Sequence, residues 1–463
     1  MLTDILNQID GYVWGPWLLA LLVGTGVWLT LRLHLLQVMK LPRALKLIFF
    51  ARNKGNGDID SFKALCTALA ATVGTGNIVG VATAIKLGGP GALFWMWLAA
   101  FFGMATKYAE GCLAVKYRSV DDQGHVAGGP MYYIEMGLGK KWKPLAGAFA
   151  LFGVMTAMLG NGTTTQMNAI TASVQAGFGV SAYITCAIIT VLVAIITFGG
   201  LKSISKTASK IVPGMAVVYF VITVIFLGYN AGELPHAISL VIDGAMNGTA
   251  AAGGFAGAGI MLVMRSGIAR GLYSNESGLG SAPIVAAAAK TKWPAEQGLI
   301  SMTGTFIDTI IICTMTGLTI IVSGVWTGDL NGAELTQAAF ASTYGSFAPF
   351  ILTISLTLFA FTTIIGWNYY GERCWEYLFG TKTIKLYRIC YIAILASAVF
   401  LKLEAIWALA DIVNGLMAIP NLIALLGLSG VIAAETKKYF AHLAVRDAKL
   451  KAYKKQCMVH GEE

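Results

Sequence analysis

Long apolar segments separated by short polar ones recur along the whole chain. A transmembrane helix needs about 20 mostly apolar residues, so the pattern predicts about 11 transmembrane helices in a single all-α, polytopic membrane domain, residues 1–463. The predicted spans are residues 14–31, 64–86, 91–115, 146–175, 181–200, 211–229, 246–265, 297–324, 346–370, 387–403 and 406–433.

Composition agrees with a lipid environment. Hydrophobic residues make up 56% of the 463 residues, charged residues make up 12%, and the mean hydropathy is +0.69. A water-soluble domain of this size could not cover so much apolar surface with so few charges. The net charge of +10 is spread over many short segments, so it does not form a nucleic-acid-binding patch.

The charges also predict an orientation. If the polar segments alternate between the two sides of the membrane, all but two of the 33 Lys and Arg residues fall on one side, leaving only Lys86 and Lys402 opposite. By the positive-inside rule that side is the cytoplasm, which places the N-terminus outside and the C-terminal tail inside the plasma membrane. Residues 40–54 and 435–455 are basic and partly amphipathic. They are expected to rest on lipid headgroups, and no obligate protein partner is evident.

Several chemical classes are excluded by residue usage. The seven cysteines are scattered without a CxxC pair, so they predict neither a zinc site nor a disulfide framework. The five histidines fall in loops, at span ends or in the tail. A membrane-embedded enzyme would need a nucleophile, a metal or paired acids, and the spans offer only one central carboxylate, Asp308. The chain is therefore expected to be no enzyme.

Two predicted spans contain glycine-rich interruptions. Residues 74–77, Gly-Thr-Gly-Asn, place polar groups near the middle of the second span, and residues 252–259 form a run of Gly and Ala with Phe255 in the seventh. An opened helix exposes N–H groups that attract a carboxylate and C=O groups that attract a cation. The two spans are five apart and antiparallel, as an inverted repeat requires. The alternative is that the glycines only permit close helix packing.

The chain resembles a known family. GTGNIVGVATAIKLGGPGALFWMW at 74–97 is similar to the signature of the alanine or glycine:cation symporters, as are GGPMYYIEMG at 128–137, SNESGLGSAP at 274–283, TGTFIDT at 303–309 and GWNYYGE at 366–372. The resemblance implies the LeuT-type fold with two broken helices in a five-plus-five inverted repeat, 64–229 and 246–403. Residues 14–63 would add an extra helix and a loop, and residues 404–463 the last helix and tail.

The resemblance further implies sodium-coupled symport of small neutral amino acids, alanine or glycine, into the cell by alternating access. The amides of Thr75 and Gly76 would receive the substrate carboxylate, and Asn77 would either add a side-chain oxygen or brace the break. Gln166 would also contact substrate, and Gly257 lies in the other expected break. Phe255 and Trp367 would wall the pocket, although Trp367 could instead be a headgroup anchor.

The co-transported sodium ion would be held by oxygen atoms without net charge. The resemblance assigns it the carbonyls of Ala70, Val73 and Phe359 and the hydroxyls of Thr362 and Thr363. The alternative for both threonines is a hydroxyl bond back to their own helix.

Acids near the spans leave further alternatives. Glu110 follows Lys107 by three residues and is expected to pair with it. Asp308, near the middle of its span, would hold a second cation or bond hydroxyls such as that of Thr305. A proton-coupled carrier that uses Asp308 is the competing hypothesis. Glu404 and Asp411 are expected near the outer surface.

Overall fold

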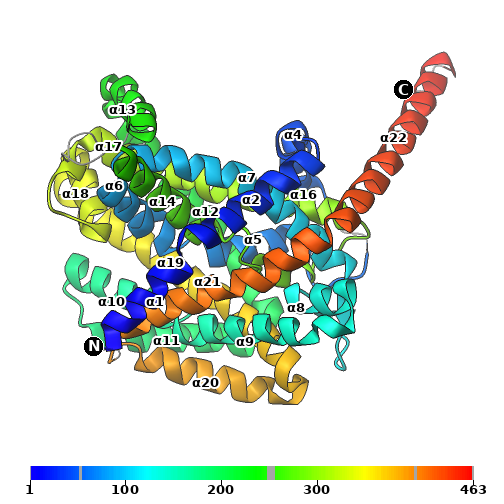
Figure 1. The fold of residues 1–463 in the computed structure, drawn as a ribbon, viewed down its shortest axis with the longest axis horizontal. Helices are drawn as coiled ribbons and strands as arrows, with labels where there is room; N and C mark the ends of the chain where they lie inside the picture. Colours follow the sequence, from blue (N-terminus) through cyan, green and yellow to red (C-terminus); the bar gives the residue numbers. More distant parts are fainter. Residues whose placement is uncertain (1, 52–54, 248–255, 401–403, 461–463) are drawn as a thin grey trace.

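The computed structural model describes residues 2–51, 55–247, 256–400 and 404–460, and in these ranges the chain is almost entirely helical (Figure 1). The first part contains α1 Leu2–Val13, α2 Pro16–Arg32, α3 Leu36–Met39, α4 Leu41–Phe50, α5 Ser61–Thr72, α6 Val81–Gly88, α7 Gly91–Lys116, α8 Pro130–Tyr133, α9 Lys143–Leu159, α10 Thr164–Phe178, α11 Ala182–Phe198 and α12 Gly200–Tyr229. A small hairpin of antiparallel strands, β1 Ser119–Val120 and β2 Val126–Ala127, follows α7.

The second part contains α13 Leu234–Asn247, α14 Ala256–Asn275, α15 Ala282–Ala286, α16 Pro294–Thr305, α17 Thr314–Ser323, α18 Gly332–Tyr344, α19 Ala348–Phe379, α20 Ile384–Ser397, α21 Glu404–Gly427 and α22 Ser429–His460. Three segments are π-helical: η1 Gly76–Gly80, η2 Ile134–Leu138 and η6 Phe306–Cys313. Single 3₁₀ turns lie at Lys140–Trp142, Ala231–Glu233, Val325–Thr327, Gly345–Phe347 and Thr381–Thr383.

The apolar helices are those of a multi-pass membrane protein, but the predicted count of about 11 spans is not confirmed. Within the described residues, six helices are long and apolar enough to cross a membrane, or seven if the bent pair Ser61–Thr72 and Gly76–Gly88 forms one span. The other predicted spans contain helices that are short or charged. For example, α11 has 17 residues, α20 has 14, and α7 carries Lys107 and Glu110 in its interior.

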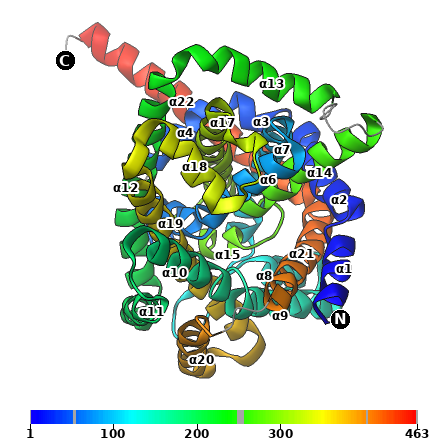
Figure 2. The same ribbon diagram turned by 90° about the vertical axis from the view of Figure 1, so that its left-hand side faces the viewer.

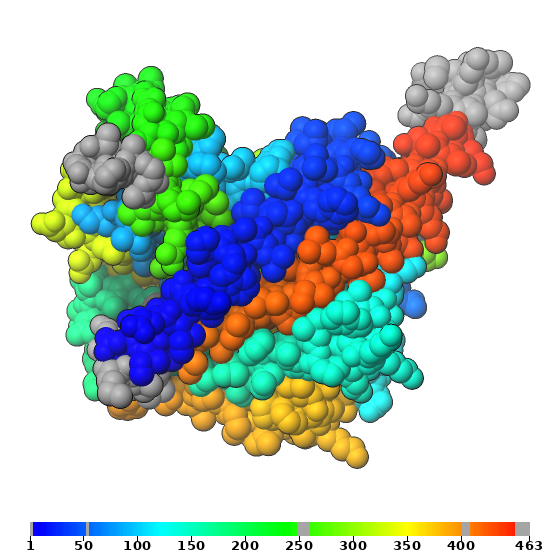
Figure 3. All heavy atoms as spheres, viewed as in Figure 1, coloured from blue at the N-terminus to red at the C-terminus, as the bar shows by residue number. Residues whose placement is uncertain are grey.

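The N-terminal helices lie against the last membrane helix. In Figures 1 and 2, α1 and α2 run beside α21, and Figure 3 shows them covering one face of the molecule together. Trp14, in the turn between α1 and α2, donates its indole N–H to the carbonyl of Asp411 in α21 at 3.0 Å. The two ends of the chain lie at opposite ends of the long axis (Figure 1).

The first predicted break is present. Helix α5 ends at Thr72, Val73 has extended dihedral angles, and the chain resumes as a π-helical turn at Gly76. The axes of the two halves differ by 54°.

The second break lies elsewhere than predicted. Residues 252–255, including Phe255, are outside the described residues, and 256–259 are already helical within α14. The helix opens instead after Asn275, where Glu276, Gly278 and Gly280 have φ angles of 55°, 90° and 84°. Positive φ is incompatible with a right-handed helix, so the chain stays open until α15 begins at Ala282.

A further interruption divides the predicted span 146–175. Helix α9 ends at Leu159 and α10 begins at Thr164, with Gly160–Thr163 between them. Three threonine hydroxyls, those of Thr163, Thr164 and Thr165, donate to carbonyls five residues earlier and satisfy the open end of α9.

Candidate functional site

A small buried cavity lies where the interrupted helices meet. Its volume is about 10 Å³, room for roughly one water molecule. It is lined by Ala71, Thr72, Gly74, Thr75, Gly76, Asn161, Gln166, Tyr273, Ser274, Glu276, Thr363 and Trp367. Residues from all three breaks and from α19 thus converge on one point in the protein interior.

Five of the predicted site residues share this cavity. They are Thr75, Gly76, Gln166, Thr363 and Trp367. The Gln166 side chain donates from Nε2 to the hydroxyl of Thr75 at 3.2 Å, while its buried Oε1 has no hydrogen-bond partner among the described residues. That oxygen is an acceptor available to a bound molecule.

Asn77 lies behind the cavity and braces the first break. Its Oδ1 accepts the backbone N–H of Gly74 at 2.8 Å. Its Nδ2 donates to Oδ1 of Asp308 at 2.7 Å and also approaches the carbonyl of Asp308 at 3.2 Å. The side chain is fully buried and is absent from the cavity wall. Of the two predicted roles for Asn77, the structure shows the bracing one.

This brace frees carbonyl oxygens at the end of α5. In a continuous helix the N–H of Gly74 would donate to the carbonyl of Ala70, and the N–H of Asn77 to that of Val73. Here Gly74 donates to the Asn77 side chain, and Asn77 donates to the carbonyl of Gly74 at 3.3 Å. The two carbonyls predicted to face sodium are therefore those that lose their helical partners.

The hydroxyl of Thr363 lies directly against this freed backbone. A Cβ built on Gly74 would overlap Oγ1 of Thr363, and one built on Gly366 would lie 2.8 Å from the backbone nitrogen of Ala71. Glycine is required at both positions because α5 and α19 approach so closely. The structure thus brings Thr363 to the end of α5.

The hydroxyls of Thr362 and Thr363 both donate to the carbonyl of Phe359 at 3.0 Å, so the back-bonding alternative describes the present arrangement. Thr362 also faces Sδ of Met215 on α12 at 3.7 Å. A hydroxyl that donates to its own helix keeps its lone pairs available as acceptors.

Asp308 connects the two broken helices. It is fully buried in η6 and accepts hydrogen bonds from Ser274 at 3.0 Å and Thr309 at 2.7 Å, in addition to Asn77. Thr305, suggested as its partner from sequence, pairs with Ser277 instead at 2.9 Å. All these donors are neutral, and they hold α14 and the first break to one carboxyl group.

Gly257 is remote from this site. It lies 17 positions before Ser274 in the same helix, which corresponds to about 25 Å at the helical rise of 1.5 Å per residue. The described part of its segment, 256–259, is helical, and α14 opens instead after Asn275. Later glycines of α14 serve packing: a Cβ on Gly267 would collide with Ala92 of α7, and one on Gly271 would lie 2.9 Å from Met96.

Trp367 lies in the protein interior. Its side chain is 1% exposed, and its Nε1 donates to Oε1 of Glu276 at 3.0 Å. The headgroup-anchor alternative is therefore wrong.

The contribution of the second break to this cavity was missed from sequence, namely that of Tyr273, Ser274 and Glu276. The strongest signal was Glu276, an acid in an otherwise uncharged segment of glycine and serine, which the predicted end of the seventh span at 265 left outside. Its other carboxyl oxygen accepts a hydrogen bond from the hydroxyl of Ser281, so Glu276 links the start of the second break to its end.

Glu110 also has a role that differs from the prediction. Its Oε1 accepts the backbone N–H groups of Gly278 and Gly280 at 3.1 and 3.2 Å and the side-chain N–H of Asn421 at 2.7 Å. No ion pair with Lys107 occurs within 4 Å in the described chain. Lys107 donates instead to the carbonyl of Glu276 at 3.2 Å. Both side chains stabilise the open backbone of the second break.

Known proteins resemble this chain over nearly its full length. The profile of the sodium:alanine symporter family matches residues 1–454. An uncharacterized transporter of Haemophilus influenzae is 56% identical over 96% of this chain and 97% of its own length. The sodium/alanine symporter AgcS of Methanococcus maripaludis is 50% identical, covering 94% and 97%. A probable sodium/glutamine symporter, GlnT of Bacillus subtilis, is 39% identical, covering 95% and 91%.

Among solved structures, MhsT in complex with L-phenylalanine aligns with a TM-score of 0.49 and 12% identity, covering 82% of this chain and 99% of that one. The named relatives are transporters, not enzymes. By the match over residues 1–454 and the identity to these relatives, the chain belongs to the sodium:alanine symporter family.

Proposed function

We propose that this protein is a sodium-coupled symporter that carries alanine and glycine into the cell across the plasma membrane, with the N-terminus outside and the C-terminal tail in the cytoplasm. The observation that carries the proposal is the first break: a buried helix opens at mid-length and presents unpaired carbonyls at Ala70 and Val73 beside amides at Thr75 and Gly76. Carbonyl oxygens suit a cation, and the N–H groups that begin the next helical segment suit a carboxylate.

The substrate carboxylate is received by the amides of Thr75 and Gly76, and Oε1 of Gln166 accepts from the substrate ammonium group. Trp367 limits the size of the side chain. Support for this arrangement comes from the shared cavity wall and from the unpaired Gln166 oxygen. Sodium is held by the Ala70 and Val73 carbonyls together with Thr363. Thr362 and the Phe359 carbonyl complete the site once their mutual hydrogen bond is exchanged for the ion.

A cavity of about 10 Å³ is too small for any amino acid, so the helices around it must separate for substrate to enter. Alternating access supplies that step. The two broken helices, related as members of a five-plus-five inverted repeat, rock as a bundle against the remaining scaffold. Asp308 keeps the broken helices together during the movement because its carboxyl group contacts both.

The sodium gradient provides the driving force. One sodium ion that enters at a membrane potential of 100 mV contributes about 2.3 kcal/mol, and a tenfold gradient adds about 1.4 kcal/mol. Their sum is about 3.7 kcal/mol, and every 1.4 kcal/mol or so corresponds to a factor of ten in concentration. One sodium ion per substrate therefore supports an accumulation of roughly several hundredfold.

The test is uptake of labelled alanine into liposomes that contain the purified protein. We expect accumulation under an inward sodium gradient and none under a potassium gradient of equal ionic strength. Competition by unlabelled glycine, serine and glutamine then ranks the substrates. Glutamine is included because one relative is named a probable sodium/glutamine symporter. Accumulation that ignores sodium would refute the proposal.

A proton-coupled carrier is the second candidate, favoured by the buried carboxyl group of Asp308 beside the site. Asp308→Asn should abolish uptake driven by a pH gradient if the proton is the coupling ion. Thr363→Ala should instead raise the sodium concentration needed for half-maximal uptake if sodium is. A pH gradient that drives accumulation in sodium-free buffer would favour the proton.

A further inference from the structure

A second cavity, of about 540 Å³, shares no lining residue with the central site and opens on the side that carries the β1–β2 hairpin. It lies between the turn that joins α11 to α12 and the turn that joins α19 to α20. Its lining residues are Asp58, Gln123, His125, Phe198, Gly199, Gly200, Leu201, Lys202, Arg373, Thr381, Lys382, Ile384, Lys385 and Arg388.

Positive charge dominates this cavity. Lys202, Lys382 and Lys385 contribute ammonium groups, and none of the three has a carboxylate within 4 Å in the part of the chain that the structure describes. The one lining carboxylate is Asp58, whose Oδ2 accepts the backbone N–H of Val126 at 2.9 Å. The three lysines therefore line the cavity without an ion pair to the described protein.

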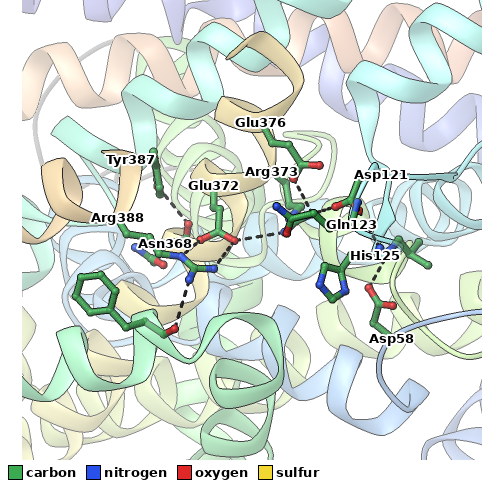
Figure 4. Close-up of polar contacts among 12 residues, drawn as sticks. Asp58, Asp121, Gln123, His125, Asn368, Glu372, Arg373, Glu376, Tyr387 and Arg388 are labelled. Atoms are coloured by element: carbon green, nitrogen blue, oxygen red, sulfur yellow. Dashed lines mark hydrogen bonds and ion pairs between the residues drawn. The ribbon is translucent and has the colours of Figure 1, made fainter. Parts of the chain in front are cut away.

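Two arginines form the inner wall (Figure 4). Arg388 pairs with Glu372 through Nε at 2.6 Å and Nη2 at 3.0 Å, and its Nη1 reaches the carbonyl of Phe198 at 3.4 Å. Arg373 contacts Glu372, Glu376 and Asp121.

The second arginine retains an unused donor. The Arg373 side chain is only 7% exposed, and its Nε has no hydrogen-bond partner among the described residues. Burial raises the pKa of Asp121, but the N–H donors of His125 and Gln123, with Arg373, outweigh it and hold that pKa below its usual value. The wall is therefore a network of ion pairs in which one buried guanidinium N–H remains unsatisfied.

Two helices begin at this cavity. The first residues of α12, Gly200 to Lys202, and the 3₁₀ turn and first residues of α20 line it. Neither helix has a side-chain cap or an acid in its first turn. The first N–H groups of a helix lack intrahelical acceptors and carry a partial positive charge. At α20 the N–H groups of Thr383 and Ile384 donate to carbonyls of the preceding 3₁₀ turn, so the start of α12 is the more open of the two.

Lys202 and Lys385 stand in these first turns, where the helix dipole disfavours a cation. The positive-inside rule accounts for lysines on this side of the membrane in general. It does not require an uncapped helix start, three lysines without ion pairs and an unsatisfied arginine to share one cavity. A bound anion would neutralise all of these groups together.

We propose that this cavity binds a phosphate-bearing anion. Its rim favours a phospholipid headgroup as the source of the phosphate, because Phe198 is 55% exposed and the lining continues through Leu201 and Ile384. Basic pockets between membrane helices are suited to anionic headgroups. The Arg388–Glu372 pair would couple the bound phosphate to α19, the helix that carries Thr363 and Trp367.

The test compares lipid retention in native mass spectrometry. Purified protein in nanodiscs of equal phosphatidylglycerol and phosphatidylcholine should retain phosphatidylglycerol selectively. Each lysine contributes about a fivefold factor in affinity, so the combined variant Lys202→Ala, Lys382→Ala and Lys385→Ala should bind about 100-fold more weakly. The matched control changes Lys140, Lys141 and Lys290 to Ala, which removes the same charge outside the cavity and should retain the lipid.

A thermal-shift measurement separates the two sources of phosphate. Phosphatidylglycerol that stabilises the wild type but not the triple variant indicates the lipid. If inorganic phosphate stabilises the wild type but not the triple variant in phosphatidylcholine nanodiscs, the bound group is a soluble anion.

The single variant Lys385→Glu supplies an acid to the first turn of α20. It should raise the melting temperature in phosphatidylcholine and lower the response to either probe. Equal lipid retention by the wild type and the triple variant would overturn the proposal. So would a wild type that neither phosphatidylglycerol nor inorganic phosphate stabilises. Neither readout depends on transport.

Discussion

Removing the Asn77 side chain tests the brace at the first break. In Asn77→Ala the backbone N–H of Gly74 loses its acceptor, and a buried unsatisfied N–H costs about 1–3 kcal/mol. Asp308 loses a donor at 2.7 Å, and a hydrogen bond to a charged group contributes about 1.5–3 kcal/mol. The Gly74 N–H can recover its loss only by donating to the carbonyl of Ala70, which closes the helix and occupies a proposed sodium ligand.

We therefore expect Asn77→Ala to weaken sodium binding more than it lowers the stability of the fold. If the substitution destabilises the open backbone by about 3 kcal/mol relative to the closed helix, the sodium concentration for half-maximal alanine uptake rises by about 100-fold. The assay is alanine uptake into liposomes over a sodium series, with thermal unfolding in detergent measured in parallel. Asn414 provides the control, since it is equally buried on α21 and its side chain has no hydrogen-bond partner among the described residues. A wild-type sodium response in Asn77→Ala would refute the reasoning.

Three other substitutions test neighbouring contacts. Gly74→Ala should abolish uptake, because the new Cβ overlaps the Thr363 hydroxyl, whereas Gly80→Ala, with no atom within 4 Å of its Cβ, should transport normally in the same assay. Trp367→Phe loses the hydrogen bond to Glu276 and should raise the alanine concentration for half-maximal uptake about tenfold, which corresponds to about 1.4 kcal/mol. Trp375→Phe loses a hydrogen bond to Thr383 instead and should leave that concentration unchanged. Glu110→Gln replaces the carboxyl acceptor of two backbone N–H groups and should lower the melting temperature by more than Glu233→Gln at an exposed site, as measured by thermal unfolding; equal shifts would contradict that role.

The first break could be predicted from sequence because its signal is local. Gly74 and Gly76 remove side chains where two helices meet, and Thr75 and Asn77 place polar groups where lipid-facing residues would be apolar. Gln166, which the resemblance assigned to the substrate, lines the cavity beside this break. These residues line or brace one site in the structure because burial forces each polar group to find a partner.

The partners themselves could not be predicted, since they depend on packing between distant helices. Asn77 and Asp308 are 231 positions apart, and nothing in either segment specifies that an amide of one bonds a carboxyl of the other. The same holds for Glu110, which was paired with Lys107 by helical spacing. In the fold its carboxylate meets backbone amides 168 and 170 positions away, which a surface ion-pair rule does not anticipate.

The misplaced second break shows which local signal is the more informative. Glycine in an apolar segment has two uses, close packing and an open backbone, and glycine content alone does not separate them. Gly267 and Gly271 serve the first use, since helix α7 occupies the space that a Cβ would need. Around Gly278 and Gly280, by contrast, the polar residues Glu276, Ser277 and Ser281 are buried, and Glu276 itself adopts a positive φ of 55°. An ionisable residue buried among glycines needs donors, and unpaired backbone or side-chain N–H groups supply them. A glycine run accompanied by a buried acid or amide therefore indicates an opened helix, and a glycine run without one indicates helix packing.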